Sequence, residues 1–218
     1  MLFADHVPEL PAGVRLLRGF LDAAAQEALL ADVVAILRAA PLFTPRMPGT
    51  GRPFSVRMTN AGPLGWVSDK EKGYRYEPRH PGTGRPWPPM PRMLLDLWAA
   101  LTGYPAPPEA ALINHYAPGA RMGLHVDNDE EALDAPLLSI SLGCSARFRL
   151  GGLKRRDRTM SFDLHAGDVL ILEGPSRLRH HGIDRIHPGT GALLTEIGEG
   201  RINITLRRVT VPHQQGPS

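Results

Sequence analysis

Three side chains from two distant stretches of the sequence have the types and spacing needed to hold a metal ion. His125 and Asp127 are one residue apart in the run GLHVDND, so in an extended chain they point to the same side. Two adjacent histidines, His180 and His181, follow much later. Two histidines and one carboxylate form the facial triad of non-haem ferrous iron, which leaves coordination positions open for a co-substrate and oxygen.

Each part of this set has a simpler interpretation when it is taken alone, because a single histidine in a strand is more often structural than a ligand. The alternation in the first stretch favours the metal site, since Leu124 and Val126 take the other face and leave His125 and Asp127 in one polar space. In the run RLRHHGI, only one of the two adjacent histidines can face that space, and periodicity does not choose between them.

The last apolar stretch, residues 201–207, alternates polar and apolar side chains. Its polar face consists of Arg201, Asn203, Thr205 and Arg207. At ~3.3 Å per residue, the two arginine α-carbons lie about 20 Å apart. A guanidinium binds a carboxylate bidentately, so two inward-pointing arginines could hold a short dicarboxylate at both ends. A strand with a solvated polar face is the alternative. Asn114 and Tyr116 share another face and could donate hydrogen bonds to a carboxylate.

The elements that must position these residues are mainly β with flanking helices. Residues 22–40 predict a helix that Asp22 caps and Pro41 ends, and residues 90–103 predict a second one. From Ala110 onward, short apolar runs alternate with turns that contain Gly or Asp, which is typical of a sandwich or jelly roll.

Residues 41–90 are rich in proline and glycine, with aromatic residues between them, and predict a short hairpin or two among ordered functional loops. We find no internal repeat and no sharp linker. We therefore expect a single domain over 1–218, with an N-terminal helical extension over about 1–50, a lid over about 51–90 and a β core over about 108–210.

Composition excludes several classes of protein. One cysteine, Cys144, rules out an internal disulfide and a cysteine-based metal cage. The N-terminal run MLFADHVPEL lacks the features of a signal peptide, and no apolar run reaches the ~20 residues of a membrane span, so we expect a soluble, cytoplasmic protein without membrane contact. The net charge of +3 is compatible with a nucleic-acid partner but is weak evidence for one.

Several longer motifs, taken together, are specific. They are MTNAGPLGW, GYRY, PWPPMP, LINHYAPGARMGLHVDNDE, APLLSISLG, GGLKRRD, GDVLILEGPSRLRHHGI and RINITLR. On these motifs the chain resembles the AlkB family of iron(II)- and 2-oxoglutarate-dependent dioxygenases, from about Phe54 to Arg208. The resemblance implies a double-stranded β-helix, which is a jelly roll, with an N-terminal nucleotide-recognition lid.

The resemblance also implies roles for individual residues. Fe(II) would be bound by His125, Asp127 and His181, which selects His181 from the adjacent pair. The co-substrate 2-oxoglutarate would be held at its keto-acid end by Asn203 and Arg207, and at its distal carboxylate by Arg201, Asn114 and Tyr116. O2 would take the remaining iron position. The alkylated base would be met by Trp66, Tyr74 and Tyr76 of the lid and by Asp129, Glu130 and Arg155.

The activity implied is oxidative demethylation of bases such as N1-methyladenine and N3-methylcytosine, with release of formaldehyde. The expected partner is alkylated single-stranded DNA, with double-stranded DNA and RNA as further partners, and we expect a monomer. An iron/2-oxoglutarate hydroxylase acting on a protein or small molecule is the main alternative, because it would share the triad and both arginines. A non-catalytic nucleic-acid-binding module would not need the triad, and a cupin-type metalloenzyme without 2-oxoglutarate would leave the arginines unexplained.

Overall fold

The computed structural model describes residues 9–193 and 195–212. Along the chain the elements are β1 (Val14–Leu17), α1 (Ala23–Ala39), β2 (Arg57–Ala61), β3 (Gly65–Asp69), β4 (Gly73–Glu77), α2 (Arg92–Thr102), β5 (Ala110–Tyr116), β6 (Met122–His125), β7 (Leu137–Gly143), β8 (Ala146–Leu150), β9 (Met160–Leu164), β10 (Val169–Leu172), a 3-10 turn (Gly174–Ser176), β11 (His181–Ile186) and β12 (Arg201–Arg207). Most of the N-terminal run examined for a signal peptide lies outside the described residues.

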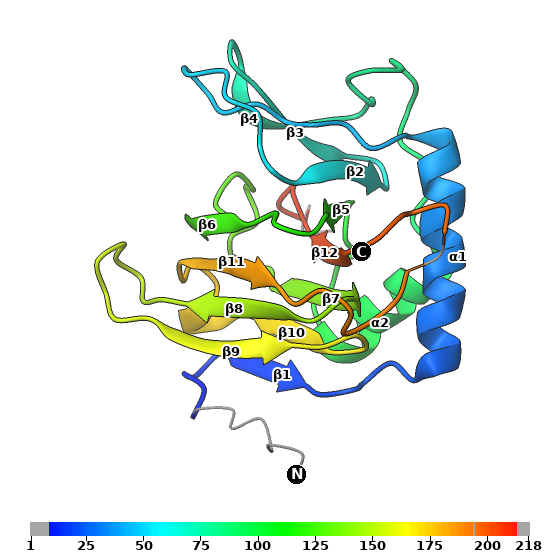
Figure 1. Cartoon of the computed structure of the whole chain (residues 1–218). Helices are drawn as coiled ribbons and strands as arrows, with labels where there is room; N and C mark the ends of the chain where they lie inside the picture. Colours follow the sequence, from blue (N-terminus) through cyan, green and yellow to red (C-terminus); the bar gives the residue numbers. More distant parts are fainter. Residues whose placement is uncertain (1–8, 194, 213–218) are drawn as a thin grey trace, which may run out of the picture.

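Two antiparallel sheets face each other and confirm the predicted jelly roll (Figure 1). One has six strands in the order β1-β10-β7-β12-β5-β2, and the other has four in the order β6-β11-β8-β9. Side chains from both sheets, among them Leu112, Leu170, Phe148, Phe162 and Ile183, form a buried apolar layer between them. Because neighbouring residues of a strand point to opposite faces, every second position of the strands contributes to this layer.

The outer face of the six-stranded sheet packs against both helices. Leu29 and Val33 of α1 and Trp98 of α2 belong to one buried cluster with Ile140 and Ile204 of the sheet. The side chain of Asp22 caps α1 by accepting a hydrogen bond from the Ala25 N–H at 2.8 Å, and α2 ends at a left-handed glycine, both as expected from the sequence. Among the described residues, no helix is long and apolar enough to cross a membrane.

The strands divide the chain differently from the expected boundaries. The N-terminal segment contributes β1, which pairs with β10, and the expected lid contributes β2, which pairs with β5. The six-stranded sheet therefore contains strands from outside residues 108–210. What stands apart is the β3–β4 hairpin, a separate two-stranded sheet above the end of the roll (Figure 1).

Replacing Asp22 with Ala should destabilise the fold by about 1 kcal/mol, because the first turn of α1 loses its capping acceptor. For a domain of this size that corresponds to a melting temperature about 2–4 °C lower. Asp22→Asn keeps an acceptor and should melt close to the wild type. Identical melting of the wild type and Asp22→Ala by calorimetry would show that the cap contributes nothing.

Candidate metal centre and its cavity

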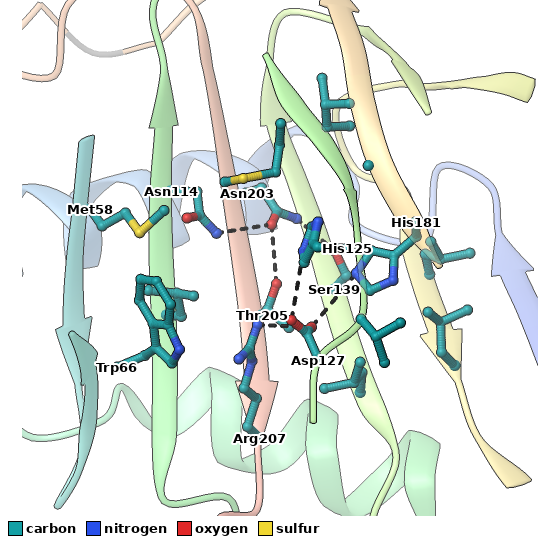
Figure 2. A pocket seen from close by; sticks show the side chains of 18 of the residues that line it. Met58, Trp66, Asn114, His125, Asp127, Ser139, His181, Asn203, Thr205 and Arg207 are labelled. Atoms are coloured by element: carbon teal, nitrogen blue, oxygen red, sulfur yellow. Dashed lines mark hydrogen bonds and ion pairs between the residues drawn. The ribbon is translucent and has the colours of Figure 1, made fainter. Parts of the chain in front are cut away.

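Two histidines face each other across a pair of antiparallel strands. In the register of β6 and β11, His125 lies directly opposite His181, and their ring centroids are 4.6 Å apart. Asp127 follows the end of β6, and each of its carboxylate oxygens lies 3.6 Å from the Nε2 of one histidine. The three side chains converge on one point (Figure 2), with their ligand-type atoms within 4.8 Å of one another.

Backbone carbonyls orient both imidazoles. The Nδ1 of His125 lies 2.9 Å from the carbonyl of Gly123, and the Nδ1 of His181 lies 3.0 Å from that of Arg179. Because a carbonyl only accepts, each Nδ1 must carry the proton, and each Nε2 keeps a lone pair directed at the gap between the rings and Asp127. The Nδ1 of His180 also contacts a backbone carbonyl, that of Gly152 at 3.2 Å, but this side chain differs from the other two because it does not line the cavity.

The charges at this point suit a metal ligand set. Burial, with the neighbouring His181, lowers the pKa of His125 to about 4, so this imidazole is neutral at physiological pH. Burial opposes ionisation of Asp127, but the guanidinium of Arg207 at 2.8 Å holds the pKa of its carboxyl well below the ordinary value. Two neutral imidazole nitrogens and one carboxylate oxygen are the donor set of a ferrous facial triad.

One wall of the cavity is a row of polar side chains from β12 and its neighbours. Asn203 is opposite Asn114 on β5, and its side-chain oxygen receives hydrogen bonds from Asn114 at 3.4 Å and from Thr205 at 3.1 Å. Its amide donates to the Ser139 hydroxyl at 2.6 Å (Figure 2). Ile202 and Ile204 point the other way into the core, so the predicted alternation of this strand is confirmed.

Arg201 lies at the opposite end of β12 from Arg207 and is completely buried. Its guanidinium donates to the Ser141 hydroxyl at 2.7 Å and to the Cys144 carbonyl at 3.3 Å, and no carboxylate of the described residues lies within 4.0 Å. Burial lowers its pKa to about 10, which leaves it cationic at neutral pH. A buried cation without a counter-ion is unfavourable, so this position calls for an anion.

Three buried polar atoms along the same wall have no hydrogen-bond partner among the residues that the structure describes: Asn114 Oδ1, Arg201 Nε and Arg207 Nε. Buried polar groups are normally satisfied, and exceptions call for a missing partner. Two of the three atoms belong to guanidinium groups, and the metal-ligand triad lies beside Arg207. The wall therefore fits a short dianion that also reaches the metal, as 2-oxoglutarate would.

The cavity has a volume of about 170 Å³ and extends from Arg201 past the triad to an aromatic mouth. At the mouth, the ring of Trp66 stacks on Tyr74 at 5.4 Å and meets the edge of Phe54 at 6.2 Å. The Trp66 Nε1–H donates to Asp129 at 2.8 Å, and partial burial raises the pKa of that carboxyl. Sequence patterns had not indicated Phe54, Met58 or Ser139, which also line the cavity.

Three other residues expected near the base do not line the cavity. Glu130 is buried and accepts hydrogen bonds from the Tyr76 hydroxyl, from Arg207 at 3.1 Å and from Arg177 at 3.1 Å, so its carboxylate has no free side for a base. Tyr76 also lies outside the cavity lining. Arg155 is exposed in the β8–β9 loop and reaches the Leu124 carbonyl at 3.4 Å.

Arg177 is a buried residue that no sequence pattern distinguished. Besides Glu130, its guanidinium donates to the backbone carbonyls of Asp127 at 2.6 Å and Ala135 at 2.7 Å. It thereby holds the loop that carries a metal-ligand candidate. Through Glu130 the same network joins Arg207 to Tyr76 of β4, so the wall of the cavity and the hairpin above it share one set of hydrogen bonds.

Comparisons with known proteins agree with this geometry. Residues 13–207 match the model of the 2OG-Fe(II) oxygenase superfamily, in which 2OG stands for 2-oxoglutarate, also called alpha-ketoglutarate. The chain is 54% identical over 190 residues to an alpha-ketoglutarate-dependent dioxygenase AlkB homolog of Caulobacter vibrioides, covering 87% of this chain and 84% of that protein. It is 42% identical over 214 residues to the AlkB dioxygenase of Escherichia coli K12, covering 95% and 96% of the two chains.

A solved structure extends the likeness to three dimensions. OsALKBH1 superposes with a TM-score of 0.75 at 29% sequence identity, covering 92% of this chain and 100% of that one. The sequence matches, the fold match and the convergence of His125, Asp127 and His181 all agree with one another. The chain belongs to the AlkB family of Fe(II)- and 2-oxoglutarate-dependent dioxygenases.

Proposed function

We propose that this dioxygenase removes alkyl groups from nucleobases, acting on single-stranded DNA and also on RNA. The observation that carries the proposal is that an aromatic, acid-bearing mouth and the triad belong to one continuous cavity. Trp66 and Tyr74 offer the flat apolar faces that stack on a base, and Asp129 adds a negative charge beside them. A hydroxylase of small metabolites would not need this mouth.

The residues that would hold the metal are His125, Asp127 and His181. When bound, Fe(II) together with 2-oxoglutarate and O2 supplies the oxidation that hydroxylates an alkyl carbon, with succinate and carbon dioxide as by-products. Arg201, Asn114 and Tyr116 would hold the distal carboxylate, and Asn203 and Arg207 the keto-acid end. Arg207 contacts Asp127 and so links the co-substrate end to the metal ligands.

The protein's own contribution is to position and shield the substrate. A base inside a duplex cannot reach the triad, so the target must be flipped out or already single-stranded. Stacking on Trp66 or Tyr74 would contribute about 1–3 kcal/mol per base. Hydroxylation of an N-methyl group gives a hydroxymethyl group, whose N–C bond then breaks to release formaldehyde. The base nitrogen keeps the electron pair of that bond, and for a cationic base the hydroxyl proton passes to solvent, which leaves the neutral base.

The proposed activity should appear when the protein is incubated with Fe(II), ascorbate, 2-oxoglutarate and a single-stranded oligonucleotide carrying N1-methyladenine. Formaldehyde release and restored adenine are the readouts. His181→Ala should abolish both and weaken anaerobic Fe(II) binding, because it removes one of three metal ligands. His180→Ala is the matched control and should retain most activity. No formaldehyde from the wild type, with turnover on a peptide or small molecule instead, would support the alternative hydroxylase.

Arg201→Met should remove about half or more of the stabilisation that 2-oxoglutarate confers in a thermal-shift titration. The wild type at a 100-fold excess over Kd should gain about 2.7 kcal/mol, and the variant should bind at least about tenfold more weakly because the buried guanidinium is lost. The unliganded variant should melt no lower than the wild type, since Met removes an unpaired buried charge. A variant that keeps the wild-type shift would contradict the assignment of Arg201.

Asp129→Asn tests the choice of base. N1-methyladenine carries a positive charge, whereas N3-methylthymine is neutral. Loss of the carboxylate should therefore reduce kcat/KM for N1-methyladenine at least about tenfold more than kcat/KM for N3-methylthymine, a difference of ~1.4 kcal/mol in transition-state stabilisation. The asparagine oxygen still accepts the hydrogen bond from Trp66, which separates charge from positioning. Equal losses on the two lesions would argue against an electrostatic role for Asp129.

A further inference from the structure

Contrary to the expectation of a chain without repeats, an eight-residue pattern occurs twice. Residues 46–53 and residues 79–86 both read Arg-Xaa-Pro-Gly-Thr-Gly-Arg-Pro, and each is followed by an aromatic residue, Phe54 or Trp87. We name these segments lid loop 1 and lid loop 2. A repeat this short escapes a search for repeating structural units, which are usually 20–50 residues long.

The two lid loops share two backbone hydrogen bonds. In each, the second residue donates to the carbonyl of the seventh at 2.8 Å, and the second glycine donates to the carbonyl of the second residue at 2.9 Å. An isolated bridge joins the first and last residues of both segments. The repeat in sequence is therefore also a repeat in structure.

The two arginines of each loop have different tasks. The first one closes the loop, since Arg46 donates to the Gly51 carbonyl at 2.9 Å and Arg79 donates to the Gly84 carbonyl at 3.0 Å. The second one, Arg52 or Arg85, is exposed, and neither side chain has a hydrogen bond or ion pair to any other described residue. Each loop thus presents one unengaged guanidinium to solvent.

Both loops are attached to the hairpin that carries the aromatic mouth. Lid loop 1 is bonded to β3 near the hairpin turn, where the Ser68 hydroxyl donates to the Arg46 carbonyl at 2.6 Å. Phe54, which follows this loop, contacts Trp66 of β3. Lid loop 2 is held at the other end of the hairpin, where Trp87 donates to the Glu77 carbonyl at 2.8 Å. The indole of Trp87 packs so closely on Gly65 that a Cβ there would meet it at 2.4 Å.

Positive charge is concentrated in this part of the chain. Residues 41–90 contain eight of the 25 basic residues but only three of the 22 acidic ones, so this segment carries a charge of +5 and the rest of the chain −2. Lys70 and Lys72 lie at the turn of the same hairpin, and the Lys70 stem packs beside Gly51 of lid loop 1. An anionic partner would therefore approach this face.

A third Pro-Gly-Thr-Gly stretch, residues 188–191, is not flanked by arginines. There Thr190 accepts a hydrogen bond from the Ser145 N–H at 2.8 Å and donates to the His187 carbonyl at 2.7 Å, which ties the turn to the body of the roll. Ala192 follows in place of arginine. The Pro-Gly-Thr-Gly sequence therefore also occurs in a stretch with a structural role, and the exposed arginine distinguishes the two lid loops from it.

We propose that lid loops 1 and 2 form a two-point clamp on the sugar–phosphate backbone of the nucleic acid, with Arg52 and Arg85 each binding a phosphate on opposite sides of the base in the cavity. This inference rests on the proposed function. The five-residue strands between the two attachment points span about 15 Å, so the two arginines would contact phosphates more than one nucleotide apart. Guanidinium groups suit phosphate because they bind it bidentately.

The test is the salt dependence of binding to a fluorescent single-stranded 15-mer, measured anaerobically with Fe(II) and 2-oxoglutarate. A plot of log K against log salt has a negative slope, and the double variant Arg52→Ala/Arg85→Ala should make it shallower by about 1.4. Each lost phosphate contact on a single strand removes about 0.7 from its magnitude. The same relation predicts about 25-fold weaker binding at 0.1 M salt and almost no difference near 1 M.

Two further variants make the result specific. Arg52→Lys/Arg85→Lys keeps both charges and should retain most of the slope. Arg92→Ala/Arg185→Ala removes the same charge from α2 and the outward face of β11 and should bind like the wild type. The melting temperature and its shift with 2-oxoglutarate verify that each variant is folded.

An unchanged slope in the double alanine variant, or an equal loss in the Arg92/Arg185 control, would overturn the clamp. These outcomes are independent of catalysis. A wild type that binds the 15-mer through Arg52 and Arg85 but releases no formaldehyde would overturn the proposed demethylation and leave the clamp supported, whereas demethylation with an unchanged slope would do the reverse. A wild type that does not bind the 15-mer would overturn both.

Discussion

The antiparallel register of β6 and β11 is the constraint on which the site depends. It places His125 directly opposite His181, at the separation that cross-strand neighbours always have. A shift of one residue would turn one imidazole into the outer face of the sheet and move His180 into its place. This register is held by Leu150 on β8, which pairs with His181 from the other side, and by the apolar layer between the sheets. The positions of the metal-ligand candidates therefore depend on the packing of the core.

The buried charges around the cavity are compensated at the triad end but not at the Arg201 end. Near the triad, Arg207 and Arg177 are matched by Asp127 and Glu130, so that end is balanced before a ligand arrives. At the far end, no carboxylate of the described residues lies within ion-pair distance of Arg201, and Asp168 attracts its guanidinium only from further away. A dianion entering the cavity would gain most by placing one carboxylate beside Arg201, because that cation has the least compensation from the protein.

The lid is joined to the polar wall of the cavity through a few contacts. Its hairpin presents Trp66 and Tyr74 to the mouth, and Tyr76 reaches down to Glu130 and Arg207. The hairpin is therefore anchored at its base by the same arginine that contacts a metal-ligand candidate. The two Pro-Gly-Thr-Gly loops are attached at opposite ends of this hairpin, one at Ser68 and the other at Glu77.

Much of this protein was determined by local pattern. Alternation along residues 201–207 was enough to place two arginines and an asparagine on one face, and caps and breakers located both helices, because these signals depend only on neighbouring residues. Tertiary structure decided what depends on distant partners: that Glu130 is enclosed by Tyr76, Arg177 and Arg207, that Arg201 has no carboxylate of the described residues within ion-pair distance, and that β1 and β2 complete the main sheet. Burial and pairing are properties of segments brought together from far along the chain, and no periodicity within one segment encodes its partner.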